Sequence, residues 1–412
     1  MFGDDASKAR DFSTGQGVGK AAPGGAAARR YTRAVTLFKS ASLVSLLTLA
    51  SRITGLVREL LMAATFGASA LTDAFNVAFR IPNLLRRLFA EGAFSQAFVP
   101  VLAAERETHG DQATRQMVSQ IATVLAWALT FTCVLGVLGA PVLVWAMASG
   151  LSDEGFNAAV FMTRWMFPYI AFMSFVALAA GILNTWKHFA VPAASPVLLN
   201  LCMIAAAWLG APQLQARGIE PIFAMAGGVM LGGVLQLAVQ VPALARLGLV
   251  PRIGMTWGAI RAAWAEPGVR RVLMLMGPIL LGVGVAQISL MINTQIASYL
   301  TPGSVTWLFY ADRLMEFPTA LLGVALGVVL TPQLTAAKAA GDAEKYSAML
   351  DWGLRIVVLL AVPCAVALLT FSTPLVATLF HHGKLADSDV GQIAVALSGY
   401  GAGLLGIVAI KV

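Results

Sequence analysis

Residues 72–102 read TDAFNVAFRIPNLLRRLFAEGAFSQAFVPVL, an apolar run interrupted by five charged residues. The run exceeds the roughly 20 residues that a helix needs to cross the hydrocarbon of a membrane. Each Asp or Arg near the centre of such a helix costs about 2.5–3.5 kcal/mol on insertion. The helix therefore has to face a polar interior or a water-filled cavity, which predicts a bundle of helices around a cavity.

The rest of the chain has the composition of a membrane protein. Of its 412 residues, 58% are hydrophobic and 12% are charged, whereas soluble domains carry about 25% charged residues. We predict an all-α polytopic membrane protein with ten transmembrane helices. Their predicted ranges are 36–66, 72–104, 114–149, 156–186, 189–210, 219–245, 270–300, 304–336, 344–372 and 389–412.

Four regions follow from these ranges. Residues 1–33 are rich in Gly and Ala and basic, so we expect a flexible cytoplasmic tail. The N-terminal half, with helices one to six, spans 34–245; a cytoplasmic linker spans 246–269; and the C-terminal half, with helices seven to ten, spans 270–412. The last apolar run is still in progress at Val412, so we expect the chain to be part of a longer one whose C-terminal half is incomplete.

The distribution of Lys and Arg predicts the orientation in the membrane. With a cytoplasmic N-terminus, the inside segments hold seventeen Lys and Arg residues, and the outside loops hold only Arg217 and Lys384. Cytoplasmic loops carry the excess of positive charge in membrane proteins. We therefore expect the N-terminus and the linker in the cytoplasm.

The linker contains Trp257 and Trp264, which are seven residues apart and would share one face of a helix. Arginines flank them, a composition that suits a helix lying among lipid headgroups. A plain connector between the two halves fits as well, and we favour it.

The two halves carry similar landmarks in the same order. Pro100 and Pro332 are 232 residues apart, and a Gly-Asp pair follows each of them, at 110–111 and at 341–342. Repeated halves that enclose a substrate site are a design of membrane transporters. Duplicated receptors and scaffolds also exist, and they leave the buried charges without a role.

Several charged residues of the predicted helices can neutralise one another. The candidate pairs on one helical face are Arg87–Glu91, Arg313–Glu316 and Asp73–Arg80. Arg86 has no acidic residue three or four positions away, and Arg52 has only Glu59, for which the adjacent Arg58 also competes. A surplus of buried arginine needs an anion, and a phosphate or diphosphate matches the planar guanidinium. A chloride ion or a structural network of carbonyl groups would also satisfy it.

The sequence offers no set of residues for an intramembrane enzyme or a metal site. The four histidines lie near predicted helix ends or in loops, and the three cysteines lie inside apolar runs as small core residues. No Gly-x-Ser-x-Gly motif occurs. We therefore assign no catalytic residue, no metal ligand and no cofactor.

Four stretches closely resemble the signature of the MviN/MurJ lipid II flippase family, part of the multidrug/oligosaccharidyl-lipid/polysaccharide exporter superfamily. They are the opening stretch at 72–102, GILNTWKHFAVPA at 181–193, QISLMINTQIASYL at 287–300 and YADRLMEFPTALLGVALG at 310–327. The resemblance runs from about residue 38 to the last residue.

This resemblance implies fourteen helices, of which ten are present, in two pseudo-symmetric six-helix lobes around a central cavity. It implies transport of lipid II, the undecaprenyl-diphosphate-linked peptidoglycan precursor, across the bacterial inner membrane by alternating access. Membrane lipids are the other expected partner; we expect a monomer that binds no nucleic acid, and coupling to the membrane potential or to a cation stays open. The implied substrate-binding residues are Arg52, Arg58, Arg86 and Arg313, and the implied transport-critical residues are Asp73, Glu91, Glu316, Ser51 and Thr306.

Two other transport functions are alternatives to lipid II transport. A flippase for another polyprenyl-diphosphate glycan would share the diphosphate contacts. A multidrug/cation antiporter of the same superfamily would need a cavity rich in carboxylates and aromatic rings, whereas this sequence offers arginines.

Overall fold

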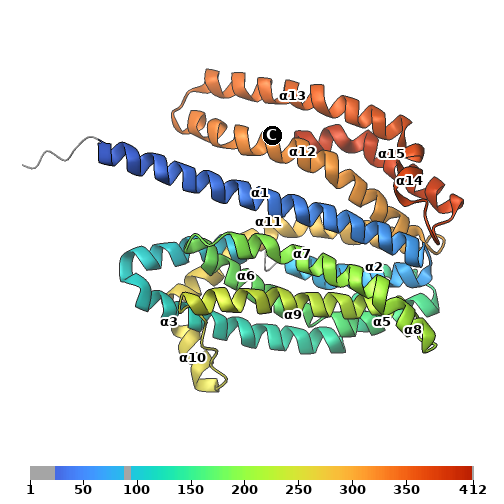
Figure 1. The fold of residues 1–412 in the computed structure, drawn as a ribbon, viewed down its shortest axis with the longest axis horizontal. Coiled ribbons are helices and arrows are strands. Elements are labelled where there is room, and N and C mark those ends of the chain that lie inside the picture. Colours follow the sequence, from blue (N-terminus) through green and yellow to red (C-terminus); the bar gives the residue numbers. More distant parts are fainter. Residues whose placement is uncertain (1–23, 88–93, 411–412) are drawn as a thin grey trace, which may run out of the picture.

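The computed structural model describes residues 24–87 and 94–410, and within this part of the chain it contains helices and no strand (Figure 1). The helices are α1 Gly24–Phe66, α2 Ala70–Arg86, α3 Ser95–Leu138, α4 Ala140–Ala148, α5 Asp153–Met166, α6 Tyr169–Thr185, α7 Ala190–Ala205, the π-helix η2 Ala206–Gly210, α8 Ala211–Ala216, α9 Phe223–Arg246, α10 Trp257–Ala265, α11 Pro267–Ser298, α12 Ser304–Ala339, α13 Ala343–Thr370, α14 Ser372–Phe380 and α15 Asp387–Ala409. The prediction of an all-α membrane protein is confirmed.

The predicted spans fall on these helices in order. Six helical segments of the described chain are long and apolar enough to cross a membrane: α3, α5–α6, α7–α8, α9, α13 and α15. A seventh is α11, whose two parts are bent by 45°. The other three predicted spans correspond to α1, to α2 with the start of α3, and to α12, and these are the helices that carry the buried charges.

Two predicted boundaries are wrong. Helix α1 begins at Gly24, so residues 24–33 are helical rather than part of a flexible tail. Residues 105–113 separate the second and third predicted spans, yet they are helical on both sides of Gly110, where φ is 77° and the helix kinks. Residues 24–33 are rich in Ala and Arg, and residues 105–115 are rich in Glu and Arg; these residue types favour the helix even where the sequence stops being apolar.

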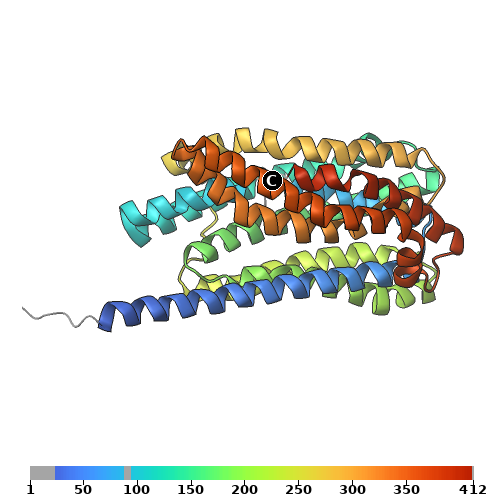
Figure 2. The same cartoon turned by 90° about the horizontal axis from the view of Figure 1, so that it is seen from above.

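The helices pack into two groups with separate cores. Figure 1 shows α12–α15 on one side of α1 and α5–α9 on the other, and each group has its own cluster of buried apolar side chains. From above, α1 lies alongside the helices of the N-terminal half, in agreement with its long contact with α7 (Figure 2). Helix α11 packs against α3 and α4 as well as against α12, so it joins the two groups.

The predicted repeat is visible in the backbone. Gly110 and Gly341 both follow a long proline-containing helix, and both adopt positive φ, at 77° and 69°. Glycine takes this left-handed conformation without the steric cost that a side chain brings. A glycine with positive φ thus lies at the corresponding place in each half, at the kink of α3 and after the end of α12.

The linker is held against α3. The indole Nε1 of Trp127 donates to the carbonyl of Gly254 at 3.1 Å, and the Gly254 N–H donates to Thr123 Oγ1 at 3.0 Å. Trp257 packs edge-on against Trp127, yet it remains 74% exposed. The linker thus contains a short helix, α10, which packs against the N-terminal half.

Candidate functional site: an arginine-lined cavity between the halves

One cavity of about 910 Å³ lies between the two groups of helices. Residues from α1, α2, α3, α4, α6, α7, α9, α11, α12 and α15 line it. Its charged lining residues are Arg52, Arg58, Arg80, Arg86, Arg87, Arg313, Asp312 and Glu316. Among the residues that the structure describes, six arginines against two carboxylates give this wall an excess of positive charge. The structure brings all four arginines of the predicted site to it, together with Ser51 and Glu316.

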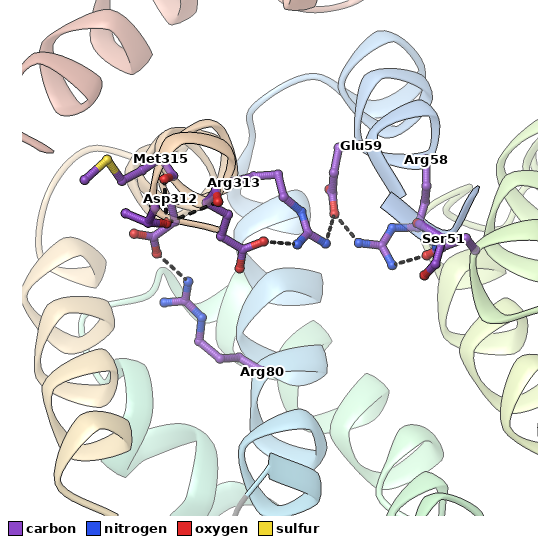
Figure 3. Close-up of polar contacts among 10 residues, drawn as sticks. Ser51, Arg58, Glu59, Arg80, Asp312, Arg313 and Met315 are labelled. Carbon is purple, nitrogen blue, oxygen red and sulfur yellow. Dashed lines mark hydrogen bonds and ion pairs between the residues drawn. The ribbon is translucent and has the colours of Figure 1, made fainter. Parts of the chain in front are cut away.

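A chain of ion pairs joins α1 to α12 across the cavity (Figure 3). The Glu59 carboxylate accepts hydrogen bonds from the guanidinium groups of both Arg58 and Arg313, the latter at 3.4 Å. Arg313 also pairs with Glu316 at 2.5 Å, so the predicted Arg313–Glu316 pair is confirmed. Glu59 is only 1% exposed, and Arg58 donates further to Asn200 Oδ1 on α7 at 2.9 Å. One buried carboxylate thus links an arginine of each half.

The predicted pair Asp73–Arg80 does not form. Arg80 instead pairs with Asp312 on α12 at 3.3 Å, as Figure 3 shows, and its guanidinium lies 5.7 Å from the centre of the Phe309 ring. Arg80 also donates to the hydroxyl of Thr294 on α11. Asp312 on the neighbouring helix α12 is closer to Arg80 than Asp73 is. Asp73 lies seven residues away on α2, and seven residues span about 10.5 Å along a helix axis.

Asp73 caps the first turn of α12. Its carboxylate accepts hydrogen bonds from Gly303 N at 2.7 Å, Thr306 N at 2.8 Å and Thr306 Oγ1 at 2.6 Å. Asn76 Nδ2 donates to the same Thr306 hydroxyl at 3.0 Å. The first N–H groups of a helix have no partner within it and carry partial positive charge, so a carboxylate is stabilised there. Asp73 and Thr306 therefore lie outside the cavity lining, at the contact between α2 and α12.

Further contacts close the same end of the bundle. The Ser149 hydroxyl lies 2.8 Å from the Tyr299 hydroxyl, and Gly150 N donates to Ser298 Oγ at 3.1 Å. Lys384 N donates to the carbonyl of Ala64 near the end of α1 at 2.9 Å. These contacts join segments of different halves.

The remaining arginines of the predicted site are Arg52 and Arg86. Arg52 is exposed and makes no hydrogen bond or ion pair with the residues that the structure describes. Arg86 donates through Nε to Asn83 Oδ1 at 2.8 Å. Glu91, and with it the predicted Arg87–Glu91 pair, lies outside the described residues.

Sequence reasoning left several lining residues out of the site. Arg80 was assigned to a pair within its own helix, and Asp312 was given no partner. Asn200, Gln236 and Gln240 also line the cavity. Their signal is an amide side chain inside a strongly apolar helix, because polar groups in such helices face a partner or a cavity.

The comparisons with known proteins agree with one another. Residues 62–412 match the family model described as "Lipid II flippase MurJ". This chain belongs to the lipid II flippase MurJ family. The lipid II flippase MurJ of Burkholderia cenocepacia is 55% identical over 380 residues, which cover 92% of this chain and 72% of that protein. The probable lipid II flippase MurJ of Vibrio cholerae is 39% identical, over 91% of this chain and 71% of that protein.

Solved structures show the same fold. A structure titled "Lipid II flippase MurJ, inward closed conformation" aligns with a TM-score of 0.74 at 24% identity, over 90% of this chain and 74% of that chain. An inward-facing multidrug resistance transporter of the MATE family aligns with a TM-score of 0.67 at 14% identity, over 88% and 80%. MurJ-family membership thus rests on sequence, and the MATE likeness concerns the fold alone.

Proposed function

We propose that this chain is a flippase that moves lipid II from the cytoplasmic to the periplasmic leaflet of the bacterial inner membrane. The observation that carries the proposal is the surplus of arginine in one cavity between the halves of a MurJ-family protein. A lipid-linked diphosphate supplies the negative charge that this surplus needs, while its tail can stay in the bilayer. The protein acts as a transporter, so its residues bind and release the substrate without changing it.

We assign the diphosphate contacts to Arg52, Arg58, Arg86 and Arg313. Guanidinium groups donate two parallel hydrogen bonds to a phosphate, which a Lys ammonium cannot do. Arg52 enters the site without a competing ion pair among the described residues, and Ser51, next to it on α1, adds a hydroxyl at the wall. Arg58 and Arg313 exchange part of their contact with Glu59 for contact with the substrate, and Glu316 keeps Arg313 in place.

Transport requires the cavity to open alternately to each side. With a cytoplasmic N-terminus, α1 ends in the periplasm, and the contacts around Asp73 and Thr306 close the periplasmic end. The N-terminal half at 34–245 and the C-terminal half at 270–412 then rock about the cavity as a monomer. Breaking the Asp73 cap on α12 opens the periplasmic side and releases lipid II there.

The test replaces each of Arg52, Arg58, Arg86 and Arg313 by Ala and by Lys in the full-length protein. We expect each Ala variant to bind lipid II at least tenfold more weakly and to flip it more slowly, and each Lys variant to recover only part of the loss. Arg164→Ala, an exposed arginine on α5 outside the cavity, is the matched control.

Wild-type binding and flipping in all four Ala variants would overturn the assignment. Equal transport of lipid II and of an unrelated polyprenyl-diphosphate glycan would instead show that the protein reads the diphosphate without selecting lipid II.

A further inference from the structure

A second part of the cavity wall carries polar groups without charge. It consists of Ser195 on α7 and of Gln236 and Gln240 on α9, all three of which line the cavity. The two glutamines are four residues apart, so they lie on the same face of α9. They are 1% and 0% exposed, and Ser195 is 2% exposed.

Most of the hydrogen-bonding atoms of these side chains are unused. Gln236 Nε2 donates to the carbonyl of Ser195 at 3.0 Å. Gln236 Oε1, both amide atoms of Gln240 and the Ser195 hydroxyl have no hydrogen-bond partner among the residues that the structure describes. A buried polar atom without a partner costs free energy. Packing alone would favour a Met or Leu of similar size at both positions.

The neighbouring amide of Asn200 is different, because its atoms are in use. Its Oδ1 accepts from Arg58 at 2.9 Å, and its Nδ2 donates to the carbonyl of Ser51 at 3.0 Å and to Thr54 Oγ1 at 3.2 Å. Asn200 therefore positions an arginine of the diphosphate site. Gln236 and Gln240 position no arginine, and their unused donors and acceptors are buried directly behind the cavity wall, where a change of side-chain rotamer brings them to the surface of the cavity.

We propose that Ser195, Gln236 and Gln240 form a subsite for the uncharged hydroxyl and amide groups of the substrate's carbohydrate–peptide head. The inference rests on the proposed function and deepens it, because it places a second recognition site beside the arginines that hold the diphosphate. A glutamine amide offers two donors and one acceptor, which match hydroxyl and acetamido groups. It carries no charge, so it adds nothing to the neutralisation of a phosphate. The subsite thus makes the protein select the head group as well as the anion.

The experiment compares Gln236→Met and Gln240→Met with wild type in lipid nanodiscs, using the full-length protein. Three probes are titrated: lipid II, its analogue without the peptide, and undecaprenyl diphosphate. We expect each variant to bind lipid II about 5- to 10-fold more weakly, the effect of one or two neutral hydrogen bonds. Binding of undecaprenyl diphosphate stays within twofold of wild type. If a variant also binds the peptide-free analogue more weakly than wild type does, the contact is with the sugars. If it binds this analogue as tightly as wild type does, the contact is with the peptide.

Thermal unfolding without substrate separates recognition from structure. Both Met variants are expected to unfold at the wild-type temperature or above it, because they remove buried polar atoms that lack a partner. The matched control is Gln120→Met on α3, where Oε1 is also buried and unpaired but the side chain does not line the cavity. It should bind all three probes like wild type.

Three results would overturn the subsite: wild-type lipid II binding in both variants, an equal loss for all three probes, or unfolding temperatures well below wild type with binding intact. Equal affinity of the wild-type protein for lipid II and undecaprenyl diphosphate would also contradict the proposed subsite, while the proposed function would stand. If the wild-type protein binds none of the probes, the proposed function itself fails.

Discussion

The Asp73 cap on α12 gives the sharpest prediction for the conformational change. Asp73→Asn keeps the size of the side chain and removes its charge. The Asn oxygen can still accept hydrogen bonds from Thr306. The new amide nitrogen then faces Gly303 N, and because both groups are donors, the hydrogen bond from Gly303 N is lost. The other two bonds, now 2.8 and 2.6 Å long, change from charge-assisted to neutral.

The size of the effect follows from these three bonds. A hydrogen bond to a charged group contributes about 1.5–3 kcal/mol and a neutral one about 0.5–1.5 kcal/mol. Losing one charged bond and weakening two others destabilises the closed end by about 3–5 kcal/mol. That corresponds to a shift of roughly two to four powers of ten in the equilibrium between closed and open ends.

Spin labels can measure this shift. Ser152 and Ser388 are exposed, and they lie near the closed end in the N-terminal and C-terminal halves. With the three native cysteines replaced, labels at these positions should give one short distance in the parent protein and a longer, broader distribution in Asp73→Asn. Asp342→Asn is the control, because Asp342 caps α13 through Lys345 N without a contact between the halves. An unchanged distance distribution in Asp73→Asn would refute the argument that the cap holds this end shut.

Three further predictions follow from other contacts. Glu59→Ala leaves two arginines without their shared carboxylate and should lower the unfolding free energy by about 3–5 kcal/mol, measured by denaturation in detergent; a change below 1 kcal/mol would contradict it. Gly150→Ala places a Cβ 2.7 Å from the backbone of α11, so the same pair of spin labels should report a loosened closed end, and an unaltered distance would count against this close contact. Cysteines at Ser152 and Trp257 should react with a membrane-impermeant thiol reagent from opposite sides of the membrane, whereas labelling from one side would reject the ten-span topology.

The sequence predicted the cavity better than the pairing inside it. Arginines in apolar helices must face a polar interior rather than lipid, so we expected Arg52, Arg58, Arg86 and Arg313 to lie around one cavity. All four line the same cavity. The expected Asp73–Arg80 pair was wrong, because spacing along one helix says nothing about the partners that neighbouring helices bring. Those partners depend on how α2 and α12 cross, which is set by packing over both halves.

The ends of the helices were also predicted less well than the cavity. The start of α1 at Gly24 and the helical stretch around Gly110 depend on helix propensity outside the apolar runs, and hydropathy does not register it. The amides of Gln236 and Gln240 stood in the sequence as polar residues of an apolar segment. Only their burial and their free hydrogen-bonding atoms distinguish them from residues that stabilise the fold.

The carboxylate of Glu59 has a consequence for the half of the cycle in which nothing is carried. A carrier that has delivered its cargo must reorient empty, and bare arginines in a closing, water-poor space would make that step expensive. Glu59 sits between Arg58 and Arg313 as an internal counter-ion. In the proposed mechanism, Glu59 neutralises part of their charge when the substrate leaves and gives up this contact when the next substrate binds. The return stroke then meets two arginines whose charge is already partly neutralised, and the substrate competes on each turnover with a carboxylate that never departs.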